Sequence, residues 1–328
     1  MNFPSISILI AARNEEQNIL RCLESIHHLN YPKERLQILI GNDDSTDNTK
    51  QITLKYIEDK PHFQLITIQE KVENLTGKAN VLAQLAHEAR GEYYFFTDAD
   101  IAVPPTWIET ILAEFSEKVG VVTGITTMES KNFFHEIQGI EWLNSLYVMY
   151  WFAKLNVPLT GMGNNMAITR EAYWQTGGYE KIGFSVTEDY DLFRAILAEG
   201  YEFKQAYCAE VLTISKPMNT WPELMQQRKR WMYGAMQLPF SIQINTWSNA
   251  LFLPILIVIA FIYPWVAWVD GISYYLLCFV TAYSALKKAN QPIKSSLFVF
   301  PIYFGIIYFV MFVNYYLPTK TVWKGRQY

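Results

Sequence analysis

Short apolar runs alternate with amphipathic stretches along roughly the first 130 residues of the chain. Five apolar runs have the length and composition of strands: residues 6–12, 37–41, 63–68, 92–96 and 119–127. Four stretches between them have the periodicity of helices: residues 16–29, 47–59, 77–90 and 105–117. Strands that alternate with helices of this length predict an α/β fold with a mostly parallel sheet. Such sheets place their binding and catalytic residues just beyond the carboxyl ends of the strands.

A different pattern begins near residue 250. Three uncharged apolar runs follow one another, at residues 250–269, 271–286 and 295–317. A membrane-spanning helix needs about 20 apolar residues, and aromatic side chains gather near the ends of these runs, as they do at membrane interfaces. A buried helical core is the alternative, but the runs lack the amphipathic partner helices that such a core requires. We therefore expect a multi-pass membrane protein in which residues 246–318 form two or three transmembrane or interfacial helices.

Basic residues indicate how these runs are oriented. Lys287, Lys288 and Lys294 lie between the second and third runs and favour the cytoplasmic side for that loop. If the first two runs form a hairpin, the domain at residues 1–245 is cytoplasmic as well. A third full span would place the basic tail, residues 319–328, outside the cell, against the same rule, so both span counts remain open. The first residues do not have the pattern of a signal peptide.

Composition shows the same division of the chain. The 328 residues are 51% hydrophobic and only 18% charged, against roughly 25% charged in a typical soluble domain. This excludes intrinsic disorder, and three cysteines in so long a chain exclude a small disulfide-stapled fold. Residues 1–249 carry 21 basic and 30 acidic side chains, a net charge of −9, whereas residues 250–328 carry +5. The overall charge of −4 argues against a nucleic-acid-binding protein.

Acidic residues follow two of the predicted strands. Asp98 and Asp100 come after the strand at residues 92–96, where two carboxylates suit a hard divalent cation bound together with the phosphates of a nucleotide. For the Asp-x-Asp sequence alone, a solvated turn is the alternative. Asp43 follows the second strand and can accept hydrogen bonds from a base or a ribose, whereas Asp47 and its neighbours can equally cap the next helix. No Gly-x-Gly-x-x-Gly follows the first strand, so a dinucleotide fingerprint is absent.

Two acidic residues, Glu188 and Asp189, open another predicted helix. Acids in a first turn complement the helix dipole, and on this sequence alone that interpretation is favoured. The functional alternative is a general base that takes a proton from an acceptor hydroxyl.

A basic helix is predicted to start near residue 221. Gln227, Arg230 and Trp231 share one of its faces. A guanidinium there can clamp a diphosphate and a tryptophan can stack on a sugar, while a basic patch against anionic lipid is a compatible alternative. The aromatic helix predicted at residues 133–152 is open to two interpretations, a core helix and an interfacial helix beside a lipid acceptor.

Taken in order, these sequences resemble the family 2 glycosyltransferases with the GT-A fold. The resemblance rests on Ala-Arg-Asn-Glu-Glu after the first strand, Asp-Asp-Ser-Thr-Asp after the second, Gly-Lys-Ala-Asn at residues 77–80, Asp-Ala-Asp, Glu-Asp and Gln-Arg-Lys-Arg-Trp. It covers about residues 5–235. The apolar runs that follow are similar to the membrane branch: cellulose, chitin and hyaluronan synthases, ceramide glucosyltransferase and bacterial lipid glycosyltransferases. The implied fold is a Rossmann-like, mostly parallel nucleotide-diphospho-sugar transferase sheet followed by C-terminal transmembrane helices.

The resemblance also implies roles for single residues. The residues implied in nucleotide-sugar binding are Ala12, Arg13, Asn14, Asp43, Lys78, Asp98, Arg228 and Arg230. The residues implied in binding Mg²⁺ or Mn²⁺ are Asp100 and Asp98, and those implied in catalysis are Asp189 as general base and Glu188 beside it. The residues implied in acceptor binding are Gln227, Trp231 and Asn165, the last within a segment at residues 161–165. A tail motif at residues 321–326 resembles one that returns towards the site in related synthases.

The reaction expected from these roles is an inverting sugar transfer. An acceptor hydroxyl attacks the anomeric carbon of a nucleotide-diphosphate sugar, a UDP-sugar being favoured, while Asp189 takes its proton. The metal and Arg230 offset the charge on the departing diphosphate. A lipid or glycan acceptor at the membrane is expected, and no nucleic acid. The alternatives are a processive polysaccharide synthase, a sugar-nucleotide nucleotidyltransferase and a non-enzymatic membrane protein that binds nucleotide.

Overall fold

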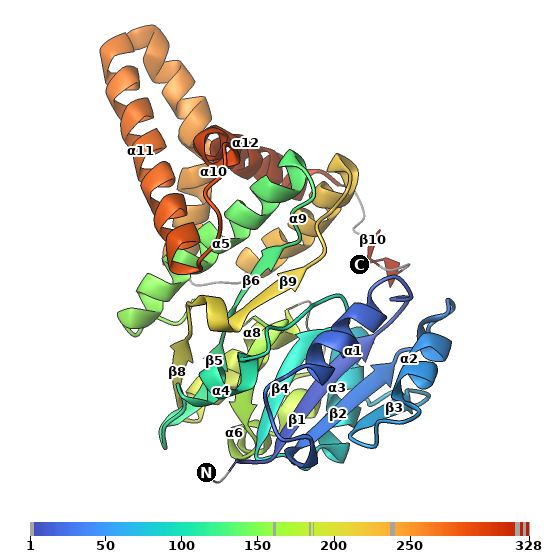
Figure 1. Ribbon diagram of the computed structural model, residues 1–328. Coiled ribbons are helices and arrows are strands. Elements are labelled where there is room, and N and C mark those ends of the chain that lie inside the picture. Colours follow the sequence, from blue (N-terminus) through green and yellow to red (C-terminus); the bar gives the residue numbers. More distant parts are fainter. Residues whose placement is uncertain are drawn as a thin grey trace. The chain divides into compact units, whose positions relative to one another are not determined.

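The computed structural model describes residues 3–159, 162–183, 185, 187–236, 240–318, 322–323 and 326–327 (Figure 1). The chain packs as two compact units. The first consists of Met1–Thr126 and Met149–Lys216, and the second of Thr127–Val148 and Pro217–Tyr328. These two units are defined by packing. The predicted boundaries at residues 245 and 318 instead separate a catalytic domain, membrane helices and a tail, and that division stays a prediction.

A seven-stranded sheet forms the centre of the first unit. Its strands are β1 (Ile6–Ala12), β2 (Leu36–Asn42), β3 (Phe63–Thr67), β4 (Tyr93–Asp98), β5 (Val119–Thr123), β7 (Asn165–Thr169) and β8 (Glu202–Gln205). The order across the sheet is β3-β2-β1-β4-β7-β5-β8, and β7 alone runs antiparallel to its neighbours β4 and β5. Runs of Ile, Leu, Val, Tyr and Phe suit strands buried on both faces, as the inner strands are here. The predicted, mostly parallel α/β sheet is confirmed.

Helices of the first unit pack as two groups. The helices are α1 (Ile19–His27), α2 (Thr49–Ile57), α3 (Gly77–Glu88), α4 (Trp107–Leu112), α6 (Arg170–Gln175), α7 (Gly178–Ile182) and α8 (Glu188–Ala198), with 3₁₀ turns η1 (Lys33–Arg35) and η2 (Ala209–Val211). α1 contacts α2, whereas α3 contacts β1, β2 and α7, and α7 in turn contacts α8. The apolar positions Ile19, Leu23 and Ile26 of α1 are fully buried, as the helical periodicity predicted.

The strand predicted at residues 119–127 is two strands. β5 ends at Thr123, and β6 (Ile125–Met128) forms a separate two-stranded sheet with β9 (Leu212–Ser215). Gly124 lies between them, and its N–H donates to the Asn165 carbonyl at 2.8 Å. A Cβ at this position would lie 2.4 Å from Oδ1 of Asn165, so the chain can leave the large sheet here only through a glycine.

The second unit is helical. Its elements are α5 (Phe133–Lys154, of which residues 133–148 belong to this unit), α9 (Trp221–Ala235), α10 (Phe240–Ile262), α11 (Pro264–Lys288), α12 (Ser296–Tyr316) and the antiparallel pair β10 (Val322–Trp323) and β11 (Arg326–Gln327). A capping box of Thr220 and Glu223 starts α9 close to the predicted residue 221. Leu224 and Met232 of α9 form an apolar core with Ile307 and Met311 of α12.

The apolar run predicted as one helix at residues 250–269 is interrupted. α10 ends at Ile262 and α11 begins at Pro264, because proline cannot donate to the preceding turn and disfavours the helical conformation of the residue before it. Within the described residues, α11 and α12 are long and apolar enough to cross a membrane, and residues 246–262 of α10 form a shorter apolar helix. The three predicted runs therefore become three helices with different boundaries.

Candidate active site

Four strand ends meet at one edge of the large sheet. Ala11 of β1 is in register with Gly41 of β2 and with Asp98 of β4, so the carboxyl ends of these parallel strands lie together. β7 runs in the opposite direction, and its first residue, Asn165, pairs with Thr97 beside Asp98. The residues that follow the three parallel strands and those that precede β7 therefore share this edge.

Arg13 and Asp43 tie the first two strand ends together. Nη1 of Arg13 donates to the backbone carbonyl of Asp43 at 2.7 Å and lies 3.9 Å from its Oδ1. The N–H of Asp43 donates to the Ala12 carbonyl at 2.9 Å. Asn14 has a φ of 52°, which asparagine tolerates, and its Oδ1 accepts from the N–H of Thr46 at 2.9 Å. Four of the residues expected to bind the nucleotide sugar, Ala12, Arg13, Asn14 and Asp43, thus lie at one hydrogen-bonded corner.

Asp47 lies one residue before the N-cap of α2, which is Asn48, and its side chain bonds to the first N–H of that helix. Its Oδ1 accepts from the N–H of Thr49, the first residue of α2, at 3.0 Å, and its Oδ2 accepts from the N–H of Glu16 at 3.1 Å. Burial alone would raise the pKa of Asp47, but these hydrogen bonds outweigh it and lower the pKa. The carboxylate is therefore committed to the scaffold.

Lys78 lies in a cluster of carboxylates. It is the second residue of α3, and its Nζ is 2.6 Å from Oδ1 of Asp98 and 4.0 Å from Oε1 of Glu188. Burial would lower the pKa of Lys78, but the negative charges of Asp98, Glu188 and Asp189 raise it above its usual value. The lysine is thus a fixed cation that links the end of β4 to the start of α8.

Asp189 is held by backbone N–H groups at the start of α8. Its Oδ2 accepts from the N–H of Gly163 at 2.7 Å, and its Oδ1 accepts from the N–H of Tyr190 at 2.9 Å. A Cβ at position 163 would lie 2.7 Å from Cβ of Asp189, so this approach requires a glycine. Both carboxylate oxygens are oriented, and the acid therefore has a defined direction in which to accept a proton.

The turn after β4 carries the second acid of the Asp-x-Asp sequence. The backbone carbonyl of Asp100 accepts from Nη2 of Arg21 at 2.5 Å, which fixes the turn to α1. Ala99, between the two acids, is buried. Among the described residues, no group of three or more His, Cys, Asp or Glu side chains is placed to hold a metal. Mg²⁺ often takes one or two carboxylates and completes its shell with substrate phosphates and water, so the donor chemistry of Asp98 and Asp100 fits such a cation.

The Gln-Arg-Lys-Arg-Trp sequence lies on α9 in the second unit. Gln227 is buried, whereas Arg230 and Trp231 are partly exposed. Arg228 is fully buried, and its guanidinium bonds to Glu141 of α5 at 2.9 and 3.0 Å. The structure thus gives Arg228 a role in packing α9, and its predicted contact with the donor stays a prediction.

Asn165 is likewise part of the scaffold. Its side chain is fully buried; Oδ1 accepts from Nε1 of Trp107 at 2.8 Å, and Nδ2 donates to the carbonyls of Ile125 and Val211 at 2.8 and 2.9 Å. These bonds use both ends of the amide, and its predicted acceptor contact stays a prediction. Gly161 of the same segment and residues 321, 324 and 325 of the tail motif lie outside the described residues.

Two residues in these arrangements were not predicted from the sequence. Gly163 was only part of a longer segment, because the need for glycine there depends on Asp189, 26 positions away. Glu141 could have been found from the sequence, because an acid between Ile140 and Trp142 in an aromatic-rich helix indicates a buried partner.

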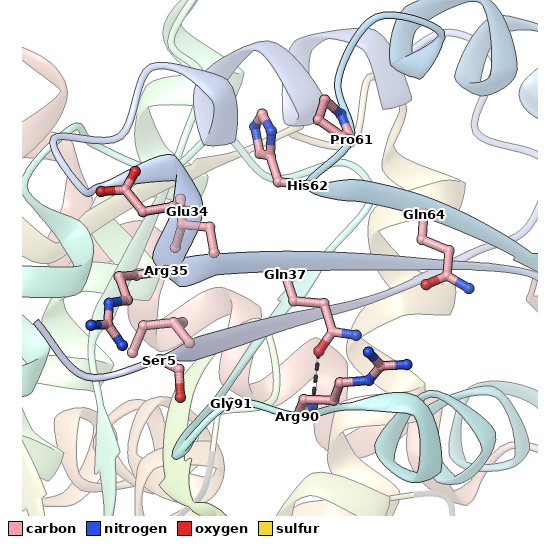
Figure 2. A pocket seen from close by; sticks show the side chains of 11 residues that line it. Ser5, Glu34, Arg35, Gln37, Pro61, His62, Gln64, Arg90 and Gly91 are labelled. Carbon is pink, nitrogen blue, oxygen red and sulfur yellow. Dashed lines mark hydrogen bonds between the residues drawn. The ribbon is translucent and has the colours of Figure 1, made fainter.

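A cavity of about 350 Å³ lies at the opposite edge of the sheet. Figure 2 shows its lining near the amino ends of β1 and β2, where Oε1 of Gln37 accepts from the N–H of Arg90 at 2.8 Å. Ser5, Arg35 and His62 also line it. None of the predicted site residues lines this cavity, and the parallel-sheet rule places chemistry at the other edge.

The sheet order, with one antiparallel strand among parallel ones and acidic residues at the parallel strand ends, defines a GT-A fold, the architecture of nucleotide-sugar transferases. The chain belongs to glycosyltransferase family 2. Residues 7–177 match the family described as "Glycosyl transferase family 2", and residues 95–317 match "Glycosyl transferase family group 2". The fold class predicted from the sequence is confirmed, as is the family that the motifs resembled.

Curated relatives of this chain include glycosyltransferases of two kinds. The beta-monoglucosyldiacylglycerol synthase of Nostoc sp. is 27% identical over 243 residues, which cover 72% of this chain and 50% of the relative. The poly-beta-1,6-N-acetyl-D-glucosamine synthase of Staphylococcus aureus (strain COL) is 28% identical over 246 residues, 71% of this chain and 55% of the relative. The probable glycosyltransferase YdaM of Bacillus subtilis is 28% identical over 240 residues, 70% and 55%. The chain thus spans about half the length of these relatives.

Solved structures share the fold. The mannosyltransferase PcManGT from Pyrobaculum calidifontis, in complex with GDP-Man and Mn²⁺, superposes with a TM-score of 0.57 at 18% identity and covers 95% of this chain and 85% of that one. GalNAc-T7 with UDP, GalNAc and Mn²⁺ superposes with a TM-score of 0.50 at 14% identity and covers 66% and 44%. At these identities the likeness shows the fold.

Proposed function

We propose that this glycosyltransferase moves a sugar from a nucleotide-diphosphate donor, a UDP-sugar being favoured, to a hydroxyl of a lipid or glycan, with inversion of the anomeric centre. The observation that carries the proposal is the geometry of Asp189, whose two oxygens are held by backbone N–H groups beside the Lys78–Asp98 ion pair. One acid is thereby oriented as a base next to a fixed cation and the Asp-x-Asp turn. The relatives support both acceptor classes, since one is named for a glucosylated diacylglycerol and another for a polymer of N-acetylglucosamine.

The reaction is a single displacement. The acceptor oxygen forms a bond to the anomeric carbon as the bond from that carbon to the diphosphate breaks, and Asp189 takes the acceptor proton. Lys78 offsets the charge on the departing nucleoside diphosphate, an electrostatic contribution that often dominates catalysis. Arg13, Asn14 and Asp43 hold the nucleoside end of the donor. Glu188 keeps Lys78 in place beside the developing charge.

Asp98 and Asp100 would hold Mg²⁺ or Mn²⁺. Such an ion supplies charge stabilisation at the diphosphate when it is bound. Two solved structures of this fold are complexes with Mn²⁺, which supports a divalent cation in this one. If the pair binds the ion, Asp100→Asn weakens Mn²⁺ binding at least tenfold by electron paramagnetic resonance titration, while the exposed Asp59→Asn leaves it unchanged.

Donor consumption by the purified full chain tests the function. UDP-glucose, UDP-N-acetylglucosamine and GDP-mannose are each incubated with Mn²⁺ and with dioctanoylglycerol or a chitin disaccharide, and release of nucleoside diphosphate is followed. We expect release with one donor, an inverted linkage in the product by NMR, and a loss of at least 1,000-fold in Asp189→Asn, because the amide cannot accept the proton. Wild-type activity in Asp189→Asn, or no release with any donor, overturns the proposal.

The length of the product separates single transfer from polymer synthesis. We propose transfer of one sugar, as in the lipid glucosyltransferase relatives. Mass spectrometry of the product should then show the acceptor extended by one residue at every time point. A ladder of longer products favours the processive alternative. The relative named as a poly-beta-1,6-N-acetyl-D-glucosamine synthase supports that alternative.

We propose that α10 and α11 cross the membrane as a hairpin. Both helices expose apolar side chains over most of their length, and at the turn between them Phe261, Trp265 and Trp268 are each more than 70% exposed. That arrangement suits lipid around the helices and aromatic side chains at an interface. Lys287 and Lys288, at the end of α11, favour the cytoplasmic side for that end.

We propose that α12 lies along the membrane surface. Nδ2 of Asn314 donates to the Met225 carbonyl of α9 at 3.0 Å, and the Leu317 carbonyl after α12 accepts from Nζ of Lys229 at 2.7 Å. Before the helix, Nζ of Lys294 lies 2.8 Å from Oε1 of Glu136 on α5. Both ends of α12 are therefore bound to helices whose charged residues are costly inside hydrocarbon.

The other face of α12 is apolar and exposed. The side chains on this face are Phe298, Val299, Ile302, Ile306, Phe309, Val313 and Tyr316. A helix that is bound on one face to helices with charged residues and is apolar on the other face fits the boundary between headgroups and acyl chains. Two spans then leave the domain at residues 1–245 and the tail on the same, cytoplasmic side.

A further inference from the structure

Glu141, in the middle of α5, is a buried acid with three hydrogen-bond donors around it. Nε of Arg228 donates to its Oε1 at 2.9 Å, and Nη2 of the same guanidinium donates to its Oε2 at 3.0 Å. The hydroxyl of Tyr303, on α12, donates to Oε2 at 2.8 Å. One carboxylate thus joins α5, α9 and α12, all within the second unit.

The guanidinium of Arg228 contacts two other residues of the Gln-Arg-Lys-Arg-Trp sequence. Nη1 of Arg228 donates to Oε1 of Gln227 at 2.5 Å. Its Cζ lies 4.1 Å from the ring centroid of Trp231, and the Trp231 ring also contacts Trp142, edge to face at 4.8 Å. Arg228 therefore orients both Gln227 and Trp231, the two residues of this helix with a predicted acceptor role.

We infer that Glu141 is a positioning residue for the acceptor, acting through Arg228 on Gln227 and Trp231. The inference rests on the proposed function. A bidentate pair between a planar guanidinium and a carboxylate fixes the direction of the guanidinium plane, which a single point charge does not. With that plane fixed, the side-chain amide of Gln227 and the indole of Trp231 each have one orientation.

Stability alone does not account for this arrangement. A buried ion pair contributes little net stability, because desolvation of the two charges offsets their attraction, and apolar residues of similar volume often serve packing as well or better. The contact of Tyr303 adds a link from the acceptor motif to α12, the helix whose other face we place against lipid. The inferred role therefore predicts a defect in acceptor use even where folding is intact.

The experiment separates acceptor use from donor use in four variants of the full chain. Glu141→Gln and Arg228→Lys remove the bidentate pair and keep the volume, and Tyr303→Phe removes only its hydroxyl. Glu141→Leu with Arg228→Met removes both charges, so that neither is left buried and unpaired. The matched control is Glu136→Gln, an acid on the same helix whose partner is Lys294. We measure hydrolysis of the donor by water and transfer to the acceptor that the wild type glycosylates, starting with dioctanoylglycerol. The thermal unfolding midpoint of each variant is measured as well.

We expect kcat/KM for the acceptor to fall about tenfold or more in Glu141→Gln and Arg228→Lys, and less in Tyr303→Phe, because charged hydrogen bonds are lost. Donor hydrolysis and the KM of the donor stay within twofold, and Glu136→Gln transfers normally. The double variant unfolds at or above the wild-type midpoint and still transfers poorly. Normal transfer by the folded double variant, or equal loss of transfer and hydrolysis in the single variants, overturns the inference and leaves the proposed function intact. A wild type that consumes no donor overturns the proposed function itself.

Discussion

A methyl group at position 163 would meet the side chain of Asp189, since its Cβ would lie 2.7 Å from Cβ of the acid. We expect Gly163→Ala to displace the carboxylate and weaken its bond from the N–H of residue 163. A misplacement of about 1 Å costs on the order of 100-fold in rate. Sugar transfer at saturating donor measures the loss. Gly271→Ala is the control, because its added methyl makes only an ordinary contact with Leu256. Equal rates for the two variants would show that the approach of Gly163 is not required.

The raised pKa of Lys78 predicts how the stabilising effect of its ion pairs depends on pH. Its pKa is raised in the folded protein by neighbouring carboxylates, which outweigh burial, so its ion pairs stabilise the fold fully below the unfolded pKa of about 10.4 and lose that effect only as pH rises through the folded pKa. The difference in unfolding midpoint between wild type and Lys78→Met should therefore be constant from pH 6 to pH 9. A difference that shrinks between pH 7 and pH 9 would place the pKa of Lys78 below its usual value and contradict the ion-pair assignment.

Residue types at strand ends were readable from the sequence, but their surroundings were not. The motif positions of Asp98, Asp100 and Asp189 follow from spacing along the chain. Asn165 and Arg228 have the same residue types as ligand-binding groups, yet each is buried with its hydrogen bonds made inside the protein. Burial depends on contacts distant in sequence, such as the 87 positions between Glu141 and Arg228, which a local pattern does not contain.

Among the elements, β7 is held in place by the amide of Asn165. Asn165→Ala removes the partner of Nε1 of Trp107 and one hydrogen bond each to the buried carbonyls of Ile125 and Val211, at a cost of about 3 kcal/mol. For a unit of this size the unfolding midpoint should fall by roughly 6–12 °C. Below that temperature the KM for the acceptor should stay at the wild-type value. Gln64→Ala, an exposed amide on β3, is the control with an unchanged midpoint. A higher acceptor KM with no loss of stability would return Asn165 to its predicted binding role.

Elements with strong periodicity were predicted well, and those set by tertiary contacts were not. β1 was predicted with its observed bounds, and α1, α2 and α3 within a few residues of theirs. The helices α6 and α7 and the short strands β7, β8 and β9 were missed, because they are four to six residues long and their pairing crosses long loops. Breaks at Gly124 and Pro264 divide runs whose hydrophobicity continues on both sides, so periodicity alone does not show them.

At the scale of the whole molecule, the uneven charge of the chain has a structural counterpart. The acidic part, at −9, contains the sheet and its carboxylate edge, and the basic part, at +5, contains the helices with exposed apolar faces. Hydrophobicity alone gave three equivalent runs, whereas the polar contacts distinguish them: α12 is bound near both ends to charged or polar groups of α5 and α9, and the α10–α11 turn is exposed. Two spans and one surface helix reconcile the basic tail with the rule that positive charge stays in the cytoplasm.

Thiol labelling in membrane vesicles tests this topology. In a chain whose native cysteines are replaced by alanine, single cysteines are placed by Tyr263→Cys at the α10–α11 turn, Ser295→Cys before α12 and Leu317→Cys after it. With a membrane-impermeant maleimide, we expect Ser295→Cys and Leu317→Cys to react in inverted vesicles and Tyr263→Cys to react in right-side-out vesicles, because two spans return the chain to its starting side. If Leu317→Cys reacts from the same side as Tyr263→Cys, then α12 crosses the bilayer, and its bonds to α5 and α9 do not hold it at the surface.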